Sequence, residues 1–365
     1  MIPAPLVQVW DATGSTALGV LAGYASITVS DVLNDLGSLT LVFPRDVDGG
    51  TLLDTDEDRQ LKLLLPGAPA MWFLNDDDAS TYVSDAPESE PISYTCRSLA
   101  GVLDEAVVYP EATFTTATPG AIVASLFAAA QSRGLLQGLT LTGGATLDAS
   151  GVAWPTNAPT VTYRVGTSLL TVLKGLADAG LLEWRMNARA LEVHRVSGGL
   201  DRTLDVVLRP RRDVLAAPLT RSRRAVATAV VVEGDAGATV RRTQALTGRR
   251  AREEYLSQTS APSGALNDVG DLYLAAHAAA DVQFTHDLTD ADESPVPWVA
   301  YRPGDRIQTV AAGAGVTSRR VAQVALSMTP EDTKVTLELG SLLKTAEEQF
   351  DAKLRRILPG ASSLT

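Results

Sequence analysis

The sequence of 365 residues has little cysteine and little histidine. Its single cysteine, Cys96, excludes an intrachain disulfide and a cysteine-rich zinc site. Because Cys96 stands in the strand-like run 93–97, we expect it to be a small buried apolar residue. His194 alternates with Glu192 along a predicted strand, so we expect it to face solvent. None of the three histidines belongs to a His-Glu-x-x-His pattern: His194, His277 and His286.

The sequence also lacks the short motifs of several enzyme classes. It contains no Gly-x-Ser-x-Gly nucleophile motif and no Gly-x-x-x-x-Gly-Lys-Ser/Thr phosphate loop. The Gly-x-Gly at 313–315 lies in a predicted β-turn and not between a strand and a helix, so it is no dinucleotide fingerprint. The sequence therefore predicts no catalytic residue, no metal ligand and no cofactor.

Long apolar runs are missing as well. No stretch approaches the roughly 20 residues that span a bilayer. The chain does not open on a basic segment followed by an apolar one, as a secretory signal would. We therefore expect a soluble protein that is made in a reducing cytoplasm. Aromatic residues make up only 5% of the chain, so the core should consist mainly of aliphatic side chains.

Charge is distributed unevenly along the chain. The net charge of −12 argues against a general nucleic-acid binder. Residues 202–252 nevertheless contain 12 arginines and four acidic residues, a local balance of 12 − 4 = +8. Two interpretations stay open: a solvated strand surface, or a basic face that meets an acidic face of a neighbouring subunit. The candidate residues of that inter-subunit basic face are Arg209, Arg211, Arg212, Arg221, Arg223 and Arg224.

Two short runs are strongly acidic. Asp54, Asp56 and Asp58 have the spacing of the first ligands in a calcium loop, but the central glycine and the final acid are missing. We interpret this run and the acidic run 76–78 as solvated loops. A second interpretation makes the latter a channel-facing or inter-subunit acidic loop that repels DNA, formed by Asp76, Asp77 and Asp78.

Alternating and apolar runs predict strands at both ends of the chain. In the N-terminal part these runs are 6–10, 25–29, 38–44, 60–65, 70–74 and 91–97. Near the C-terminus a tight turn at 303–305 precedes the runs 306–310, 320–326 and 334–339. The run 227–232 is apolar on both faces, so we expect a central strand there, followed by a hairpin turn at 234–237.

Helical spacing of apolar residues predicts four helices. The second helix is expected to be capped by Thr167 or Ser168, to extend through Asp178 and to end at Gly180. A β-hairpin with strands at 181–187 and 190–196 should follow it. The other three helices are predicted over residues 119–133, 264–283 and 341–357.

Three segments carry a resemblance to a known family. They are the ladder SLTLVFP at 38–44, the string VGTSLLTVLKGLADAGLLEWRMNARALEVHR at 165–195, and the order of turns and strands in 301–341. In pattern and order these segments resemble phage tail hub proteins. That family comprises the baseplate hubs of contractile tails and the tail-associated minor tail proteins of siphophages.

The resemblance implies an α+β, β-rich fold with two β-barrel-like tail-hub domains and an inserted α/β lobe of helix plus β-hairpin. The corresponding division of the chain is 1–110 (first β-barrel-like part), 111–200 (inserted lobe), 201–260 (strands returning to the core), 261–340 (helix and closing β-module) and 341–365 (C-terminal helix and tail).

The resemblance further implies a structural, non-enzymatic component of the virion at the phage tail tip, assembled in the host cytoplasm. Three copies would form a homotrimeric ring that joins the six-fold tail to the three-fold tip and bounds the DNA channel. Its partners would be the distal tail protein ring, the tape measure protein and other tail-tip or fibre proteins, with DNA only passing through. Subunit contacts would concentrate on strand edges, where unpaired backbone groups invite pairing.

Three alternatives stay open. A distal tail ring protein would share the strand-rich character but would be expected to lack the lobe at 167–196. A tail-tip enzyme that degrades peptidoglycan or carbohydrate would need a convergent acid pair or a metal site. The third alternative is an unrelated β-rich binding module.

Overall fold

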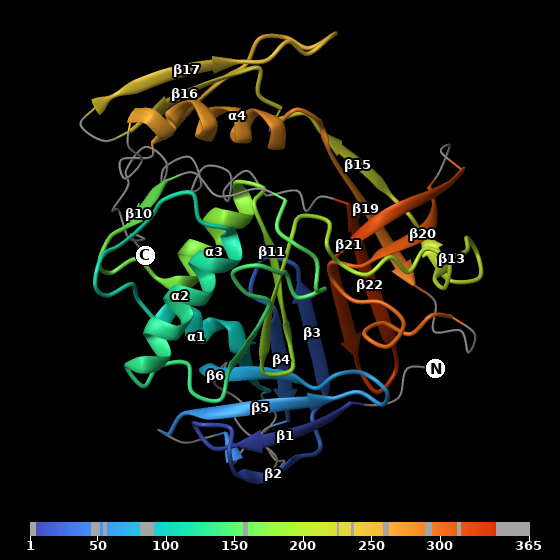
Figure 1. Ribbon diagram of the computed structural model, residues 1–365. Coiled ribbons are helices and arrows are strands. Elements are labelled where there is room, and N and C mark those ends of the chain that lie inside the picture. The colour runs from blue at the N-terminus through green and yellow to red at the C-terminus, as the bar shows by residue number, and fades with distance from the viewer. Residues whose placement is uncertain are drawn as a thin grey trace.

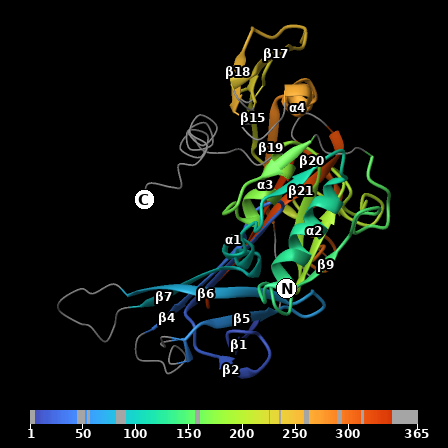
Figure 2. The same cartoon turned by 60° about the vertical axis from the view of Figure 1, so that its left-hand side comes forward.

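The computed structural model describes residues 5–44, 52–53, 57–80, 91–155, 160–224, 226–234, 237–257, 263–288, 294–311 and 315–340. For residues 76–80, 276 and 311 it describes the backbone alone. The described part has three regions: a large antiparallel sheet, a lobe of helices and short strands beside it, and a small unit that projects from one end (Figures 1 and 2).

The large sheet has 14 strands, and its main path runs in the order β14-β19-β22-β21-β3-β4-β7-β6-β5-β1-β2. Its N-terminal strands are β1 (Leu6–Trp10), β2 (Ala17–Leu21), β3 (Ser26–Val32), β4 (Ser38–Phe43), β5 (Arg59–Leu64), β6 (Met71–Ser80) and β7 (Ile92–Ser98). Its later strands are β13 (Val207–Leu208), β14 (Val214–Ala216), β15 (Leu219–Ser222), β19 (Asp281–Leu288), β20 (Arg306–Ala311), β21 (Gly315–Met328) and β22 (Thr333–Gly340).

Strands from the N-terminal and the C-terminal parts of the chain pair in this sheet. β3 pairs antiparallel with β21, with Val29 opposite Leu326 and Ile27 opposite Met328. Both strands alternate apolar and polar residues, so each has one face that favours burial. Val29 and Leu326 are buried in the same core. The opening strands and the closing strands therefore form one sheet over one core.

The predicted strands at both ends of the chain are present, and β21 is longer than predicted because its first half pairs with β20. The α+β, β-rich fold class with an inserted lobe is confirmed. Among the described strands the pairing path is open, from β14 and β15 at one edge to β2 at the other, and closes no barrel. The domain boundaries stay a prediction.

The sequence did not predict β2, and it wrongly predicted a loop at 76–78. β2 shows no alternation because its outward residues Leu18 and Val20 are apolar like its inward ones. The acidic run lies in β6, where the backbone of Asp77 and Asp78 is held by pairing with β7 past a bulge at Asn75. Pairing with a neighbouring strand thus overrides the local preference of aspartate for loops.

The lobe follows β7 and has its own core. It contains η3 (Leu99–Gly101), α1 (Val102–Glu105), β8 (Ala112–Phe114), α2 (Pro119–Ser132), β9 (Thr140–Thr142), β10 (Val161–Tyr163), α3 (Leu169–Asp178), β11 (Glu183–Asn187) and β12 (Ala190–His194). β11 and β12 form an antiparallel hairpin, and β9 adds a parallel strand to it. Aliphatic residues of α2 and α3 pack with this hairpin, so the lobe is a layer of helices on a small sheet.

The lobe helices begin where the sequence predicts. The Thr118 hydroxyl accepts a hydrogen bond from the Ala121 backbone N–H at 3.1 Å, and Pro119 occupies the first turn of α2. The Ser168 hydroxyl caps α3 in the same way, at 3.2 Å from the Thr171 nitrogen. Such caps satisfy backbone donors that the first helical turn leaves free. The predictions for both helices and for the hairpin are confirmed.

The projecting unit is a three-stranded sheet with one helix on it, at the top of Figures 1 and 2. It comprises β16 (Ala229–Glu233), β17 (Thr239–Thr243), β18 (Glu253–Ser257), η5 (Ser263–Ala265) and α4 (Leu266–Ala276). β16 is the central strand, as its apolar character on both faces predicts. The unit is inserted between β15 and β19, which pair with each other in the large sheet.

The helix predicted over 264–283 is shorter than expected. α4 ends at Ala276, and β19 begins at Asp281. Within β19 every second residue is buried, as in a strand: Phe284, His286 and Leu288 are buried, while their neighbours are partly exposed. The helix predicted at 341–357 lies outside the described residues. In the described part of the chain, no helix has the length and apolar character needed to cross a membrane.

Candidate assembly surfaces and the charged junction beneath the lobe

A buried arginine joins the lobe to the closing strands. Arg185 on β11 donates through Nε to a carboxylate oxygen of Glu192 on β12 at 2.8 Å. Its Nη1 donates to the Asp305 carboxylate at 3.1 Å and to the Pro303 carbonyl at 2.6 Å, in the turn before β20. All three charged side chains are buried. One guanidinium therefore holds a lobe strand, its hairpin partner and a turn of the large sheet together.

Glu192 is the most heavily bonded carboxylate of this junction. Besides Arg185, it accepts hydrogen bonds from Asn187 at 2.7 Å and from Arg302 at 3.3 Å, and His194 Nε2 lies 3.3 Å away. Burial acts to raise the pKa of Glu192, but the hydrogen bonds from His194 and Arg185 and the charges of Arg185 and Arg302 outweigh it and hold this pKa below its ordinary value. The carboxylate therefore stays ionised inside the protein.

Two further contacts fix the same hairpin. The Glu183 carboxylate forms an ion pair with Arg320 on β21 and accepts the Ser197 backbone N–H at 2.9 Å. Asn34, in the turn between β3 and β4 at a left-handed φ of 62°, exchanges hydrogen bonds with the backbone of Trp184 at 2.7 and 3.0 Å. The open end of the hairpin, at Glu183 and Trp184, is thus held by β21 and by the turn between β3 and β4.

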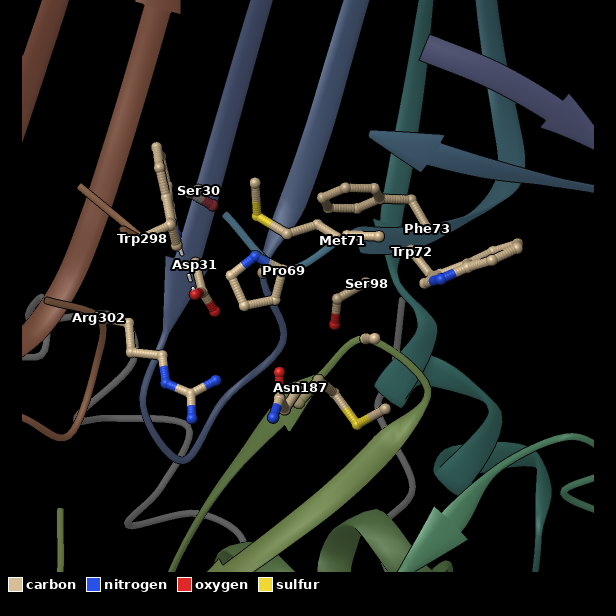
Figure 3. Close-up of a pocket in the computed structure, with 14 residues that line it drawn as sticks. Ser30, Asp31, Pro69, Met71, Trp72, Phe73, Ser98, Asn187, Trp298 and Arg302 are labelled. Carbon is tan, nitrogen blue, oxygen red and sulfur yellow. Dashed lines mark hydrogen bonds between the residues drawn. The ribbon is translucent and has the colours of Figure 1, made fainter. Parts of the chain in front are cut away.

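An open pocket lies beside this junction, between the large sheet and the hairpin turn (Figure 3). It is open to solvent and is walled mainly by apolar side chains of β6 and by Trp298. Its polar side chains are Ser30, Asp31, Ser98, Asn187 and Arg302. The Ser98 hydroxyl is buried and has no hydrogen-bond partner within the described part of the chain.

Asp31 is the acid of this pocket. Its carboxylate accepts a hydrogen bond from the Trp298 indole at 3.1 Å (Figure 3). Burial raises the pKa of Asp31 to about 6, and the Trp298 hydrogen bond and the charges of Arg185 and Arg302 offset only part of this effect. Asp31 is the single acid among the described residues that line the pocket, so these residues supply no second carboxyl for an acid–base pair.

His194 was predicted to face solvent, and this prediction is wrong. The imidazole is buried, with Nδ1 3.1 Å from the Ser150 hydroxyl and Nε2 near Glu192. This Ser–His–Glu arrangement differs from that of a catalytic serine whose proton is taken by a histidine base. Ser150 donates its proton to the Gly198 carbonyl at 2.9 Å, and Glu192 is already paired with arginine. The geometry fits a structural role, in which the three side chains tie the loop at 150 to the hairpin.

The structure describes only part of the two acidic runs that the sequence singles out. Asp76, Asp77 and Asp78 lie in β6, and nothing beyond their backbone is described. Asp58 is exposed beside β5, while Asp54 and Asp56 lie outside the described residues. Among the described residues no cluster of three histidine, cysteine or acidic side chains could hold a metal ion. A channel-facing or inter-subunit role of the acidic run stays a prediction.

The six predicted arginines lie along one edge of the large sheet. Three precede β14 and three lie in or after β15. Arg212 is turned inward: it donates two hydrogen bonds, at 2.9 and 3.0 Å, to the fully buried carboxylate of Asp213. The side chains exposed to solvent are Arg209, Arg211, Arg221, Arg223 and Arg224. Their role between subunits stays a prediction.

The sequence reasoning did not identify the junction. Arg185 and Glu192 are directly opposite each other in the hairpin that was predicted, so a cross-strand ion pair could have been inferred from the register. The third partner, Asp305, is separated from Arg185 by 120 residues and is brought there only by the tertiary fold. Cys96 is buried in β7, as predicted.

Comparison with known proteins finds similarity only at the level of structure. No protein-family model matches the sequence, and no curated protein matches it. The tail protein from Neisseria meningitidis MC58 superposes with a TM-score of 0.60 at 14% identity, over 93% of this chain and 97% of that one. The 43 kDa tail protein of prophage MuSo2 from Shewanella oneidensis gives 0.60 at 13% identity, over 92% and 98%.

A third solved structure shows the same likeness in fold. The prophage tail protein gp18 from Listeria monocytogenes EGD-e superposes with a TM-score of 0.57 at 13% identity, over 97% of this chain and 100% of that one. At such identities the likeness concerns the fold. The chain therefore has the fold of phage tail proteins, and the resemblance to the tail hub family that its sequence carries is confirmed at that level.

Proposed function

We propose that this protein is a structural component of a phage tail tip and forms a trimeric hub ring. The ring would join the six-fold tail tube and distal tail protein ring to the three-fold tip and bound the DNA channel. The observation that carries the proposal is the match in fold to three tail proteins over more than nine-tenths of both chains in each case.

The charged junction supports this proposal. A subunit that transmits force between rings needs its lobe fixed to its sheet, and Arg185 with its buried partners provides such a fixed joint. Removing one member of a buried ion pair leaves the other charge unpaired in the protein interior, which is strongly unfavourable. We propose that the junction serves assembly by keeping the subunit rigid and that the protein has no catalysis of its own.

The test is the native mass of the purified chain, measured by light scattering or native mass spectrometry, alone and with the other tail components of its phage. We expect a trimer, either alone or only with those components, since ring subunits often assemble only on their partners. A hexamer would favour a distal tail ring protein. A chain that stays monomeric and ignores tail components would contradict the proposal.

A further inference from the structure

Within the described part of the chain, two edges of the large sheet expose apolar side chains. At one end β2 has the sequence ALGVL, with Leu18 and Val20 pointing outward, and Val20 is 50% exposed. At the other end, the segment LAAPLT of β14 and β15 exposes Leu215 to 73%. β2 pairs only with β1, and β15 only with β19, among the described strands. The two edges lie at opposite ends of the molecule in both views (Figures 1 and 2).

Free apolar edges are unusual because they invite pairing with another chain. Natural sheets protect such edges with charged residues, proline or a covering element. β2 contains neither a charged residue nor proline. We call β2 the apolar edge, and β14 with β15 and the flanking arginines the arginine edge.

Charge distinguishes the two edges. Residues 209–224 contain six arginines and one acid, a balance of 6 − 1 = +5, so the remainder of the chain carries −12 − 5 = −17. A second copy therefore offers the arginine edge a predominantly acidic partner.

Acidic groups lie at the turn end of the apolar edge. Asp11, in the turn that joins β1 to β2, accepts hydrogen bonds from the Ser15 backbone N–H and hydroxyl, both at 2.8 Å. These hydrogen bonds hold the pKa of Asp11 well below its ordinary value, so it stays charged. Glu57 and Asp58 are exposed at the start of β5, where Glu57 pairs with Arg59 at 2.6 Å.

Two described cations near the apolar edge, Lys62 and Arg189, contact tryptophan rings. Lys62 lies over the rings of Trp10 and Trp72, at 5.2 and 5.3 Å from their centres, and Arg189 lies 4.7 Å from the centre of the Trp72 ring. The apolar edge therefore combines an apolar strand with neighbouring carboxylates, and the arginine edge combines an apolar strand with neighbouring guanidinium groups.

We infer that the arginine edge of one copy pairs with the apolar edge of a second copy, so that the sheet continues from subunit to subunit. This inference rests on the self-assembly in the proposed function and names the surfaces that perform it. The contact joins two different strands, β15 of one copy and β2 of the next, so it is a head-to-tail contact. Such a head-to-tail contact closes a ring when its rotation divides a full turn.

The first experiment changes the apolar edge. The double variant Leu18→Lys/Val20→Lys places two cations opposite the arginines, and both positions are exposed, so the fold should persist. Under the conditions in which the unmodified chain forms its oligomer, we expect the dissociation constant of the variant's oligomer to be at least about tenfold higher. The matched control is Val316→Lys, which is 62% exposed at the β20–β21 hairpin and belongs to neither edge strand. It should assemble as the unmodified chain does.

The second experiment reverses the charge of the arginine edge. Arg221→Glu/Arg223→Glu/Arg224→Glu should weaken assembly to a similar degree. Combining these three changes with Leu18→Lys/Val20→Lys in one chain puts opposite charges on the two edges again, and assembly should recover. Recovery identifies a direct contact, because changes at sites that do not touch would add their effects. Additive loss would overturn the inference.

A cross-link distinguishes a head-to-tail contact, in which the apolar edge meets the arginine edge, from a two-fold contact between two apolar edges. Copies carrying Val20→Cys are mixed with copies carrying Leu219→Cys and treated with a short bis-maleimide. The native Cys96 is buried, which makes the unmodified chain the background control. A cross-linked dimer in the mixture alone supports the head-to-tail contact. Cross-linking within the Val20→Cys protein by itself would show a two-fold contact between apolar edges and overturn it.

The outcomes separate this inference from the proposed function. If every edge variant assembles like the unmodified chain and no mixed cross-link forms, the edges are not the contact, and the trimeric hub can still be correct. If the unmodified chain stays monomeric with all tail components present, the proposed function itself fails. Circular dichroism of each variant establishes that it is folded before its assembly is measured.

Discussion

Two groups of arginines in this protein do opposite things. Arg185, beneath the lobe, is buried and donates to two carboxylates and a carbonyl, so its position is determined by the fold. Arg223 and Arg224, at the edge of the large sheet, are exposed. Buried charges act on the stability of the subunit, whereas exposed charges act on what the subunit meets. The same residue type is thus buried in a cohesive contact in one region and exposed in the other, where the proposed contact between copies would use it for recognition.

The largest loss of stability is expected when the buried guanidinium of Arg185 is removed. Arg185→Met should lower the free energy of unfolding by about 3–5 kcal/mol, because Glu192 and Asp305 would then lack their main counter-charge in the interior. Urea unfolding followed by tryptophan fluorescence measures the loss. As a control, a triple variant that also carries Glu192→Leu and Asp305→Asn should recover part of it. A loss below about 1 kcal/mol would show that the junction is not a cohesive element.

A pH series tests the acid beside the junction. The folded pKa of Asp31, about 6, lies above the value of roughly 3.9 expected in the unfolded chain. The folded protein therefore holds the proton more tightly, and the contribution of Asp31 to stability falls as pH rises from about 4 to 6.

Asp31→Asn removes this titration and keeps an acceptor for Trp298. The variant should be more stable than the unmodified protein at pH 7, by about 1–3 kcal/mol, and equal to it below pH 4. Protonation of Glu192 at low pH destabilises both proteins alike, so it cancels in the difference between their free energies of unfolding. A stability difference that does not change between pH 4 and 7 would contradict the raised pKa.

A half-exposed polar contact should have an intermediate effect. Ser168→Ala removes the cap of α3 and should lower the free energy of unfolding by about 1 kcal/mol. Ser168→Asp is the matched control, since its carboxylate can accept the same backbone N–H. Thermal unfolding of the three proteins gives the comparison, and an alanine variant as stable as the aspartate variant would show that the hydroxyl does not act as a cap.

The exposed arginines should have the smallest effect on stability. Arg223→Ala/Arg224→Ala should change the free energy of unfolding by less than about 0.5 kcal/mol, because both side chains are in water. Urea unfolding of the monomeric protein at low concentration checks this. A loss above about 1 kcal/mol would show that these arginines stabilise the subunit as Arg185 does, and would contradict the difference between the two groups.

The sequence predicted the elements of this protein better than their partners. Local signals were sufficient for the lobe: Ser168 caps a helix, an apolar stripe follows it, and the hairpin turns where predicted. Local signals failed where contacts with other segments of the chain determine the conformation or the burial of a residue. The run at 76–78 is composed of loop-forming residues and is nevertheless a strand, because β7 lies beside it. His194 alternates with Glu192 and is nevertheless buried, because the loop at 150 covers it.

The candidate sites divide in the same way. The arginine-rich segment was visible as a composition, since charge can be counted along a chain. The junction was not visible, because Asp305 meets Arg185 only when the closing strands return to the first ones. The apolar edge was missed because an exposed strand with apolar residues on both faces has no period in sequence.

By itself the sequence determined the β-rich class, the helices of the lobe and the excess of arginine after residue 200, because periodicity, caps and charge are local properties. Only the tertiary structure decided that N-terminal and C-terminal strands share one sheet, that Arg185 is buried between the lobe and that sheet, and that β2 and β15 lie at edges of it. Those facts depend on which strands pair, and pairing between strands some 300 residues apart is a property of the whole core and of no single segment.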